Sequence, residues 1–187
     1  IESLYCIVEA GNDKISLDEN FANVVDGNHI ILCLPFENDT TWLECTSNKN
    51  PFGYLGDFTD DRLVLACGSS GGKILRTPSY TPDQNTQLRK AHLTVKEDGS
   101  LEGTVNTIFA GTQFDNHYPN VFKSPNDQIK ALKSYYDIDN IMFHNCAYTV
   151  EDMKGLLLIE DLDISVKNYI VKNASTFILM PNLFNTI

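Results

Sequence analysis

The sequence has few basic residues, and this shortage excludes several classes of function. Its 187 residues include 14 Lys and Arg against 25 Asp and Glu, so the formal net charge is −11 at pH 7. Residues 1–82 contain 5 basic and 12 acidic side chains, and residues 83–187 contain 9 and 13. Without a basic half, the chain lacks the electrostatic footprint of a protein that binds nucleic acid or an anionic membrane surface. No hydrophobic run has the length of a membrane span, so none is expected.

Cysteine is present, but it lacks the spacing of a metal site or of a disulfide framework. The count is five, which is odd, and no CxxC pair occurs. Both features argue against a zinc site and against a fully paired framework. All five lie in or beside apolar, strand-like segments, as expected for small buried side chains, and one disulfide between neighbouring strands stays open as an alternative. The five are Cys6, Cys33, Cys45, Cys67 and Cys146.

The acidic residues also lack a metal-ligand pattern. Asp57, Asp60 and Asp61 crowd one loop without the full ligand spacing of a calcium loop, so no metal is expected there. The histidines have no ligand-like spacing either, and no cofactor is expected. The acidic segment 160–163 is predicted to be a solvated strand edge, where charge discourages aggregation.

Strand signals dominate the pattern and predict a mainly β fold. Segment 4–10 is rich in β-branched and aromatic residues and ends at a Gly-Asn-Asp turn, and the apolar segment 63–67 ends at a Gly-Ser cluster. Residues 77–86 are polar and contain two prolines, which is typical of a linker. We therefore expect two domains, residues 1–80 with an antiparallel sheet and residues 84–187.

The second domain is predicted to be an antiparallel β-sandwich with one helix. Segments 92–96 and 100–109 alternate around a Glu-Asp-Gly turn, which indicates a hairpin. Ser124, followed by Pro125 and an acid in the first turn, is typical of a helix start, and helical spacing continues to about residue 137. The later segments with strand character are 138–150, 155–159, 162–172 and 177–180.

Two neighbouring strands of the first domain carry a histidine and a carboxylate. Strand 28–35 begins near His29, and strand 41–46 contains Glu44. A four-residue hairpin loop would place the two side chains directly opposite each other, with Cβ atoms about 5 Å apart. A two-residue loop at 38–39 would offset them by roughly 13 Å. In the first register the carboxylate would orient the imidazole, as in a Cys–His–acid triad; otherwise both residues are typical of a solvated surface.

Three short motifs give these two residues a family context. They are Asn-His-Ile-Ile at 28–31, Trp-Leu-Glu-Cys-Thr at 42–46 and Asn-Pro-Phe-Gly-Tyr-Leu at 50–55. Together they resemble bacterial transglutaminase-like proteins of the papain-like cysteine protease superfamily. The resemblance covers residues 1 to about 80 well, and the remainder resembles the family's C-terminal β-rich domain more loosely. It implies that His29 is the triad histidine, that Glu44 is the triad acid, and that the protein is extracytoplasmic, either periplasmic or on the cell surface.

The resemblance also implies that this chain lacks the nucleophile. In the family, a cysteine at the start of a helix precedes the strand that begins this sequence, whereas Cys6 already lies inside that strand. Glu44 stands where the family has Asp, and Cys45 where it has Pro. We therefore expect a C-terminal fragment, inactive alone, of a protein that hydrolyses peptides or transfers acyl groups through a thiolate. Its expected partners are the upstream half of its own chain and a protein or peptide substrate.

Two other interpretations use the same residues differently: a non-catalytic β-sandwich module that binds a protein or glycan, and a structural spacer.

A missing helix would also leave one sheet face, with Ile31, Cys33 and Trp42, without its cover. An apolar patch of several hundred Å² is unusual on a soluble monomer. We expect this face to be covered, either by self-association or by a part of the chain that folds back over it.

Overall fold

The computed structural model describes residues 2–21, 23–37, 39–152, 155–173, 176–178 and 182–184. Its internal contacts divide the chain into two units, residues 1–84 and 85–187. The predicted mainly β class is confirmed, since the strands form a five-stranded antiparallel sheet, a four-stranded antiparallel sheet and a two-stranded ribbon. Among the helices of these described residues, none is long and apolar enough to cross a membrane.

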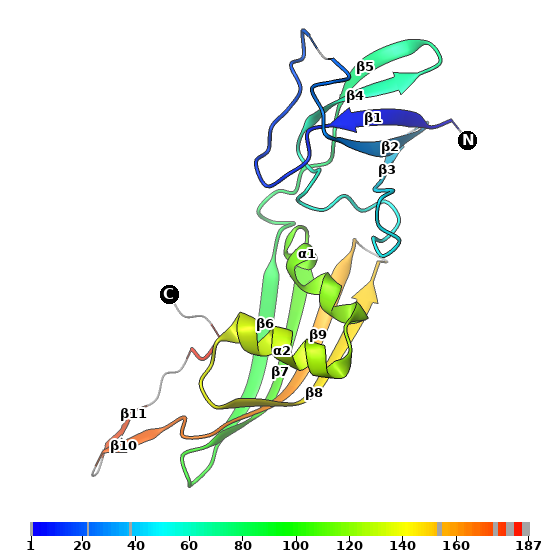
Figure 1. Ribbon diagram of the computed structural model, residues 1–187. Coiled ribbons are helices and arrows are strands. Elements are labelled where there is room, and N and C mark those ends of the chain that lie inside the picture. Colours follow the sequence, from blue (N-terminus) through cyan, green and yellow to red (C-terminus); the bar gives the residue numbers. More distant parts are fainter. Residues whose placement is uncertain are drawn as a thin grey trace. The chain divides into compact units, whose positions relative to one another are not determined.

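Unit 1 is built on the five-stranded sheet, with strand order β3-β2-β1-β4-β5 (Figure 1). Long segments connect β1 to β2 and β3 to β4, whereas short turns connect β2 to β3 and β4 to β5. The strands are β1 (Leu4–Val8), β2 (His29–Phe36), β3 (Asp39–Leu43), β4 (Leu63–Gly68) and β5 (Gly71–Arg76).

The inner face of this sheet is a closed hydrophobic core. Ile31, Cys33 and Trp42, which we expected on an uncovered face, are almost completely buried. Leu55, from the segment that joins β3 to β4, packs in the same cluster. Burial of apolar area at about 25 cal/mol per Å² stabilises this arrangement without a second chain. Of the two covers that we expected, the structure shows the one made by the chain itself.

The outer face of the same sheet is also apolar, but it is open. Side chains at alternate positions along each strand point away from the core, because paired residues share one face of a sheet. The apolar residues at these outward positions are Tyr5, Ile7, Ile30, Leu32, Leu34, Phe36, Leu43, Leu63, Leu65, Cys67 and Ile74. Most of them are half-buried or exposed; Ile7 is the buried exception.

Unit 2 is built on the four-stranded sheet, with strand order β6-β7-β9-β8. Its strands are β6 (Gln87–Val95), β7 (Leu101–Ala110), β8 (Ile141–Glu151) and β9 (Leu157–Val166). The helical segments are α1 (Gln113–His117), the 3-10 turn η1 (Tyr118–Phe122) and α2 (Pro125–Tyr136), and the ribbon consists of β10 (Val171–Asn173) and β11 (Thr176–Ile178). The predicted hairpin is β6–β7, and Ser124 caps α2 as predicted.

In unit 2, helices rather than a second sheet cover the inner face. Figure 1 shows α1 and α2 lying across β6–β9, and Leu132 of α2 packs in one core cluster with Val105 and Leu162 of the sheet. The expected sandwich is therefore replaced by a helix-on-sheet arrangement. The sequence signalled only the capped helix, because α1 and η1 are five residues each and too short for a periodic pattern.

The acidic segment 160–163 is not at an edge. It lies in β9, which pairs with β7 on one side and β8 on the other. Glu160 faces the helices and is fully buried, while Asp161 and Asp163 face outward and are exposed. The polar pair 160–161 interrupts the apolar pattern, and this is why the sequence predicted two strands where the structure has one. Of the predicted segment 177–180, residues 177–178 belong to β11, and 179–180 lie outside the described residues.

Candidate functional site

The candidate site is formed by His29, the first residue of β2, and Glu44, which directly follows β3. Nε2 of His29 lies 2.8 Å from Oε2 of Glu44. The histidine side chain is 16% exposed and the glutamate side chain 8%. The pair is thus within hydrogen-bonding distance and sheltered from bulk water, while part of the imidazole still reaches the surface.

The strand pairing that produces this contact differs from both registers expected from the sequence, the one with a four-residue loop and the one with a two-residue loop at 38–39. Leu32 pairs with Leu43, and Phe36 with Asp39. If the ladder continued in this register, Glu44 would lie opposite Ile31 rather than His29. Diagonal neighbours on one face of a sheet remain within reach of long side chains, and glutamate is one methylene longer than aspartate. The expectation that only directly opposed positions could meet was therefore wrong, although the two side chains do meet.

Glu44 is held on its second oxygen by Thr46. Oε1 accepts hydrogen bonds from the Thr46 backbone N–H at 2.9 Å and from its hydroxyl at 2.7 Å. Burial alone raises the pKa of Glu44, but the hydrogen bonds from Thr46 and His29 outweigh it, and the pKa lies below its usual value. Glu44 is therefore ionised at neutral pH, and both of its oxygens have partners that fix its orientation.

His29 is positioned by the residues around it. The side chain of Asn28 accepts from the backbone N–H of Ala10 at 2.8 Å and donates to the Ala10 carbonyl at 3.0 Å, so it extends the β1–β2 pairing by one step. The ring of Phe58 meets the imidazole edge-on, with centroids 5.6 Å apart. Glu44 selects the neutral tautomer that carries its hydrogen on Nε2. No described residue forms a hydrogen bond with Nδ1.

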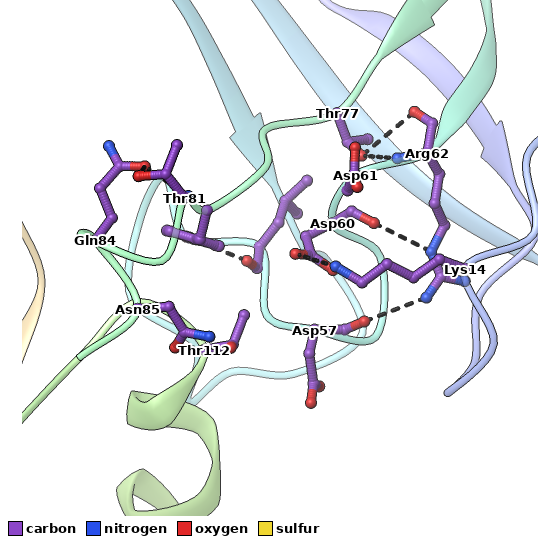
Figure 2. A network of polar contacts seen from close by, with 12 residues as sticks. Lys14, Asp57, Asp60, Asp61, Arg62, Thr77, Thr81, Gln84, Asn85 and Thr112 are labelled. Atoms are coloured by element: carbon purple, nitrogen blue, oxygen red, sulfur yellow. Dashed lines mark hydrogen bonds and ion pairs between the residues drawn. The ribbon is translucent and has the colours of Figure 1, made fainter. Parts of the chain in front are cut away.

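A buried arginine, Arg62, connects the loop at 57–60 to the segment that follows β1. Figure 2 shows its hydrogen bonds to Asp57 and Asp60. Arg62 has no exposed surface. Its side chain donates to the carbonyl oxygens of Asp57 and Asp60, each at 3.2 Å, and to those of Glu9 and Gly11. Asp57 and Asp60 lie on either side of Phe58 in the chain, and Glu9 and Gly11 lie on either side of Ala10. Arg62 therefore holds the backbone on both sides of Phe58 and on both sides of Ala10, the residue to which Asn28 is hydrogen-bonded.

The aspartate-rich loop beside Arg62 is paired with basic side chains. Oδ2 of Asp60 lies 2.8 Å from Nζ of Lys14, and Oδ1 of Asp61 lies 3.2 Å from Nη1 of Arg76. Burial raises the pKa of Asp60, and Lys14 offsets part of this effect. Within the described ranges, no group of three or more His, Cys, Asp or Glu side chains is arranged to hold a metal ion.

Two of the five cysteines are buried as expected, whereas Cys45 is exposed and Cys67 and Cys146 are half-buried. All five are free thiols, so the open alternative of an inter-strand disulfide is not realised. Cys6 and Cys33 lie on the inner face and are buried; burial raises the pKa of Cys6 to about 12 and also raises that of Cys33. A nucleophilic cysteine needs the opposite, a lowered pKa. No hydrogen bond between a cysteine and His29 occurs in the part of the chain that the structure describes.

Unit 2 contains a second histidine–glutamate pair, which the sequence did not indicate. Glu160 accepts hydrogen bonds from the hydroxyls of Tyr136 at 2.6 Å and Tyr148 at 2.8 Å. Nδ1 of His117 lies 4.0 Å from Glu160, beyond hydrogen-bonding distance, and has no hydrogen-bond partner among the residues that the structure describes. The imidazole is stacked on Phe109 with centroids 3.8 Å apart.

Burial controls the charge of this second pair. It raises the pKa of Glu160 more than the two tyrosine hydroxyls lower it. It also lowers the pKa of His117 to about 4, with a further contribution from the nearby Arg89. His117 is therefore a neutral aromatic ring at physiological pH. The pair is enclosed between the sheet and the helices and offers neither nitrogen to solvent.

Sequence reasoning found His29 and Glu44 but missed the residues that position them. Thr46 carries a local signal, because a hydroxyl two residues after a carboxylate commonly bonds back to it. Phe58 and Arg62 carry no such signal, since Phe58 reaches His29 only through the packing of a distant loop and Arg62 acts only on the backbone of that loop and of the segment after β1. Comparisons with protein-family models, curated proteins and solved structures found no match to this chain.

Proposed function

We propose that His29 and Glu44 are the base and the orienting acid of a thiol-dependent reaction at amide or ester carbonyls, and that the cysteine comes from outside these 187 residues. The observation that carries the proposal is the contact of 2.8 Å between Nε2 and Oε2, with the other oxygen of Glu44 held by Thr46. The motif resemblance to transglutaminase-like proteins supports the same assignment and an extracytoplasmic location.

In the proposed mechanism, the base is Nδ1 of His29, the nitrogen that forms no hydrogen bond with a described residue. With Nε2–H held by Glu44, Nδ1 accepts the proton of a cysteine thiol, and the resulting imidazolium is stabilised by the carboxylate. The thiolate attacks the carbonyl carbon, and the imidazolium returns the proton to the leaving amine or alcohol as the acyl–sulfur bond forms. Water or a second amine then takes the acyl group and restores the thiol. The substrate class is a protein or peptide.

The first test concerns the 187-residue chain alone. We expect iodoacetamide to alkylate its five cysteines slowly at neutral pH. The His29→Ala variant should react at the same rates, because no described cysteine is hydrogen-bonded to His29 and the proposed nucleophile is absent. A fast-reacting cysteine that slows in His29→Ala would contradict the proposal that the nucleophile lies elsewhere.

The second test uses a chain extended by whatever sequence is encoded ahead of Ile1. A cysteine at a helix start in that segment should react rapidly, and His29→Ala or Glu44→Ala should slow it at least tenfold. His92→Ala is the matched control, since His92 is an exposed histidine of unit 2. The absence of such a cysteine, or a rate that does not depend on His29, would favour the non-catalytic module that binds a protein or glycan.

A further inference from the structure

The outer face of the unit 1 sheet has the composition of a buried surface. Tyr5, Ile30 and Phe36 lie on it and are 45%, 41% and 46% exposed. Leu32 and Leu34 lie between them on β2 and are half-buried. Every outward position of β2 is therefore apolar and at least partly open to solvent.

The sheet of unit 2 shows what a solvated face looks like in the same chain. Its outward positions on the two central strands include Thr104, Asn106, Asp161 and Asp163. Antiparallel sheets with one face in water normally alternate in this way, whereas sheets covered on both faces are apolar throughout. Apart from Asp39 and Arg76 at strand ends, the outward strand positions of unit 1 carry no charge.

We propose that this outer face is a docking surface for an amphipathic helix whose apolar stripe is flanked by basic residues. An apolar sheet face is covered either by helices or by another sheet. The five strands span about 19 Å across four strand spacings, which matches a helix of about 13 residues.

The charges around this face favour a basic amphipathic helix over a second copy of the chain. Exposed acidic residues border the face: Glu2 precedes β1, Glu37 lies in the β2–β3 turn, and Asp39 begins β3. The cation at an outward position, Arg76, is paired with Asp61. Two copies, each with a net charge of −11, would bring acidic borders together, whereas Lys or Arg beside an apolar stripe would face them. The proposal stands independently of the chemistry assigned to His29.

The probe is a synthetic amphipathic peptide of about 14 residues, with leucines at helical spacing and lysines beside them. A second peptide has glutamates in place of the lysines. Binding is measured by fluorescence anisotropy at low salt, and helix formation by circular dichroism. The Lys peptide should bind and become helical, and the Glu peptide should bind at least tenfold more weakly.

Three variants locate the contact. Tyr5→Lys and Phe36→Lys should each weaken binding of the Lys peptide at least tenfold; the second keeps the test decisive if the first does not fold. Phe52→Lys adds the same charge at an exposed apolar residue of the β3–β4 segment and should change binding less than twofold. Failure of both peptides to bind, or equal loss in the Phe52 variant, overturns the proposal. Concentration-dependent dimerisation in sedimentation velocity that Tyr5→Lys abolishes would assign the face to a second copy instead.

Discussion

Each unit of this protein contains a histidine close to a glutamate, His29 with Glu44 in unit 1 and His117 with Glu160 in unit 2, and the two pairs differ in what surrounds them. In unit 1, Glu44 contacts His29 directly at 2.8 Å, and the imidazole remains partly exposed with Nδ1 free among the described residues. In unit 2, the hydroxyls of two tyrosines donate hydrogen bonds to the side chain of Glu160, and the His117 ring is stacked on Phe109 in the core. The same two residue types therefore form a partly accessible pair in one unit and a buried, packed pair in the other. Access and partners decide the difference.

The largest expected effect concerns the enclosed pair. Glu160→Ala should lower the free energy of unfolding of unit 2 by about 3–5 kcal/mol, because it leaves the buried hydroxyl of Tyr136 and the hydroxyl of half-buried Tyr148 without their acceptor. Urea titration followed at 222 nm reports on unit 2, since both α-helices lie there. Fluorescence of Trp42, the only tryptophan, reports on unit 1 and should not change. An equal shift in both signals would show that the units do not unfold separately.

The second prediction concerns pH. The pKa of Glu160 is raised, so its contribution to stability is lost as pH rises through its folded-state value. The pKa of His117 is lowered to about 4, so its contribution is lost as pH falls from about 6.5 toward 4. As pH rises from about 4.5, the loss from Glu160 and the gain from His117 oppose each other. The wild-type unit should therefore depend less on pH than a variant that keeps only one of the two groups.

Variants that remove one of the two groups should show the pH dependence of stability that the other group causes. Glu160→Gln should leave a stability that falls with decreasing pH, with a slope up to about 1.4 kcal/mol per pH unit. His117→Gln should leave the opposite slope. Urea titrations at several pH values measure both. Parallel curves for the wild type and both variants would mean that neither group changes its ionisation on folding.

Disrupting the accessible pair, His29 and Glu44, should reduce stability much less than disrupting the buried pair. Glu44→Ala should cost unit 1 about 1 kcal/mol, because the lost hydrogen bonds can be replaced in part by water. Its clearer effect is on His29, whose ring should change from the tautomer with hydrogen on Nε2 to a mixture, as measured by nitrogen NMR of the imidazole. Since the pKa of Glu44 is lowered, its contribution to stability is present above about pH 4.5 and is lost in acid. A loss as large as that of Glu160→Ala would remove the distinction between the pairs.

The smallest effect should come from the cap of α2, the helix that carries Tyr136 to Glu160. Ser124→Ala removes an oxygen that accepts from the Asp127 backbone N–H at 3.3 Å, and should cost about 0.5–1 kcal/mol. Only the unit 2 transition should move. Since Tyr136 lies at the other end of the helix, its hydrogen bond to Glu160 should persist, and an unchanged pH profile would show this.

Local patterns were sufficient to predict several elements. Alternating apolar residues predicted the β6–β7 hairpin, and Ser124-Pro125 predicted the start of α2, because both signals depend on neighbours in the chain. The shared strand parity of His29 and Glu44 pointed to one sheet face for the same reason. The chain by itself therefore determined the β class, the capped helix and the candidate pair.

Only the tertiary structure decided the rest. The register that brings Glu44 diagonally to His29 depends on where the β2–β3 turn closes, and the burial of Glu160 depends on tyrosines from α2 and β8. A polar residue inside a strand has the same sequence signal whether it faces water or a buried hydroxyl. Its environment is set by contacts between segments far apart in the chain, and those contacts made one glutamate a partner for an accessible histidine and the other part of a core.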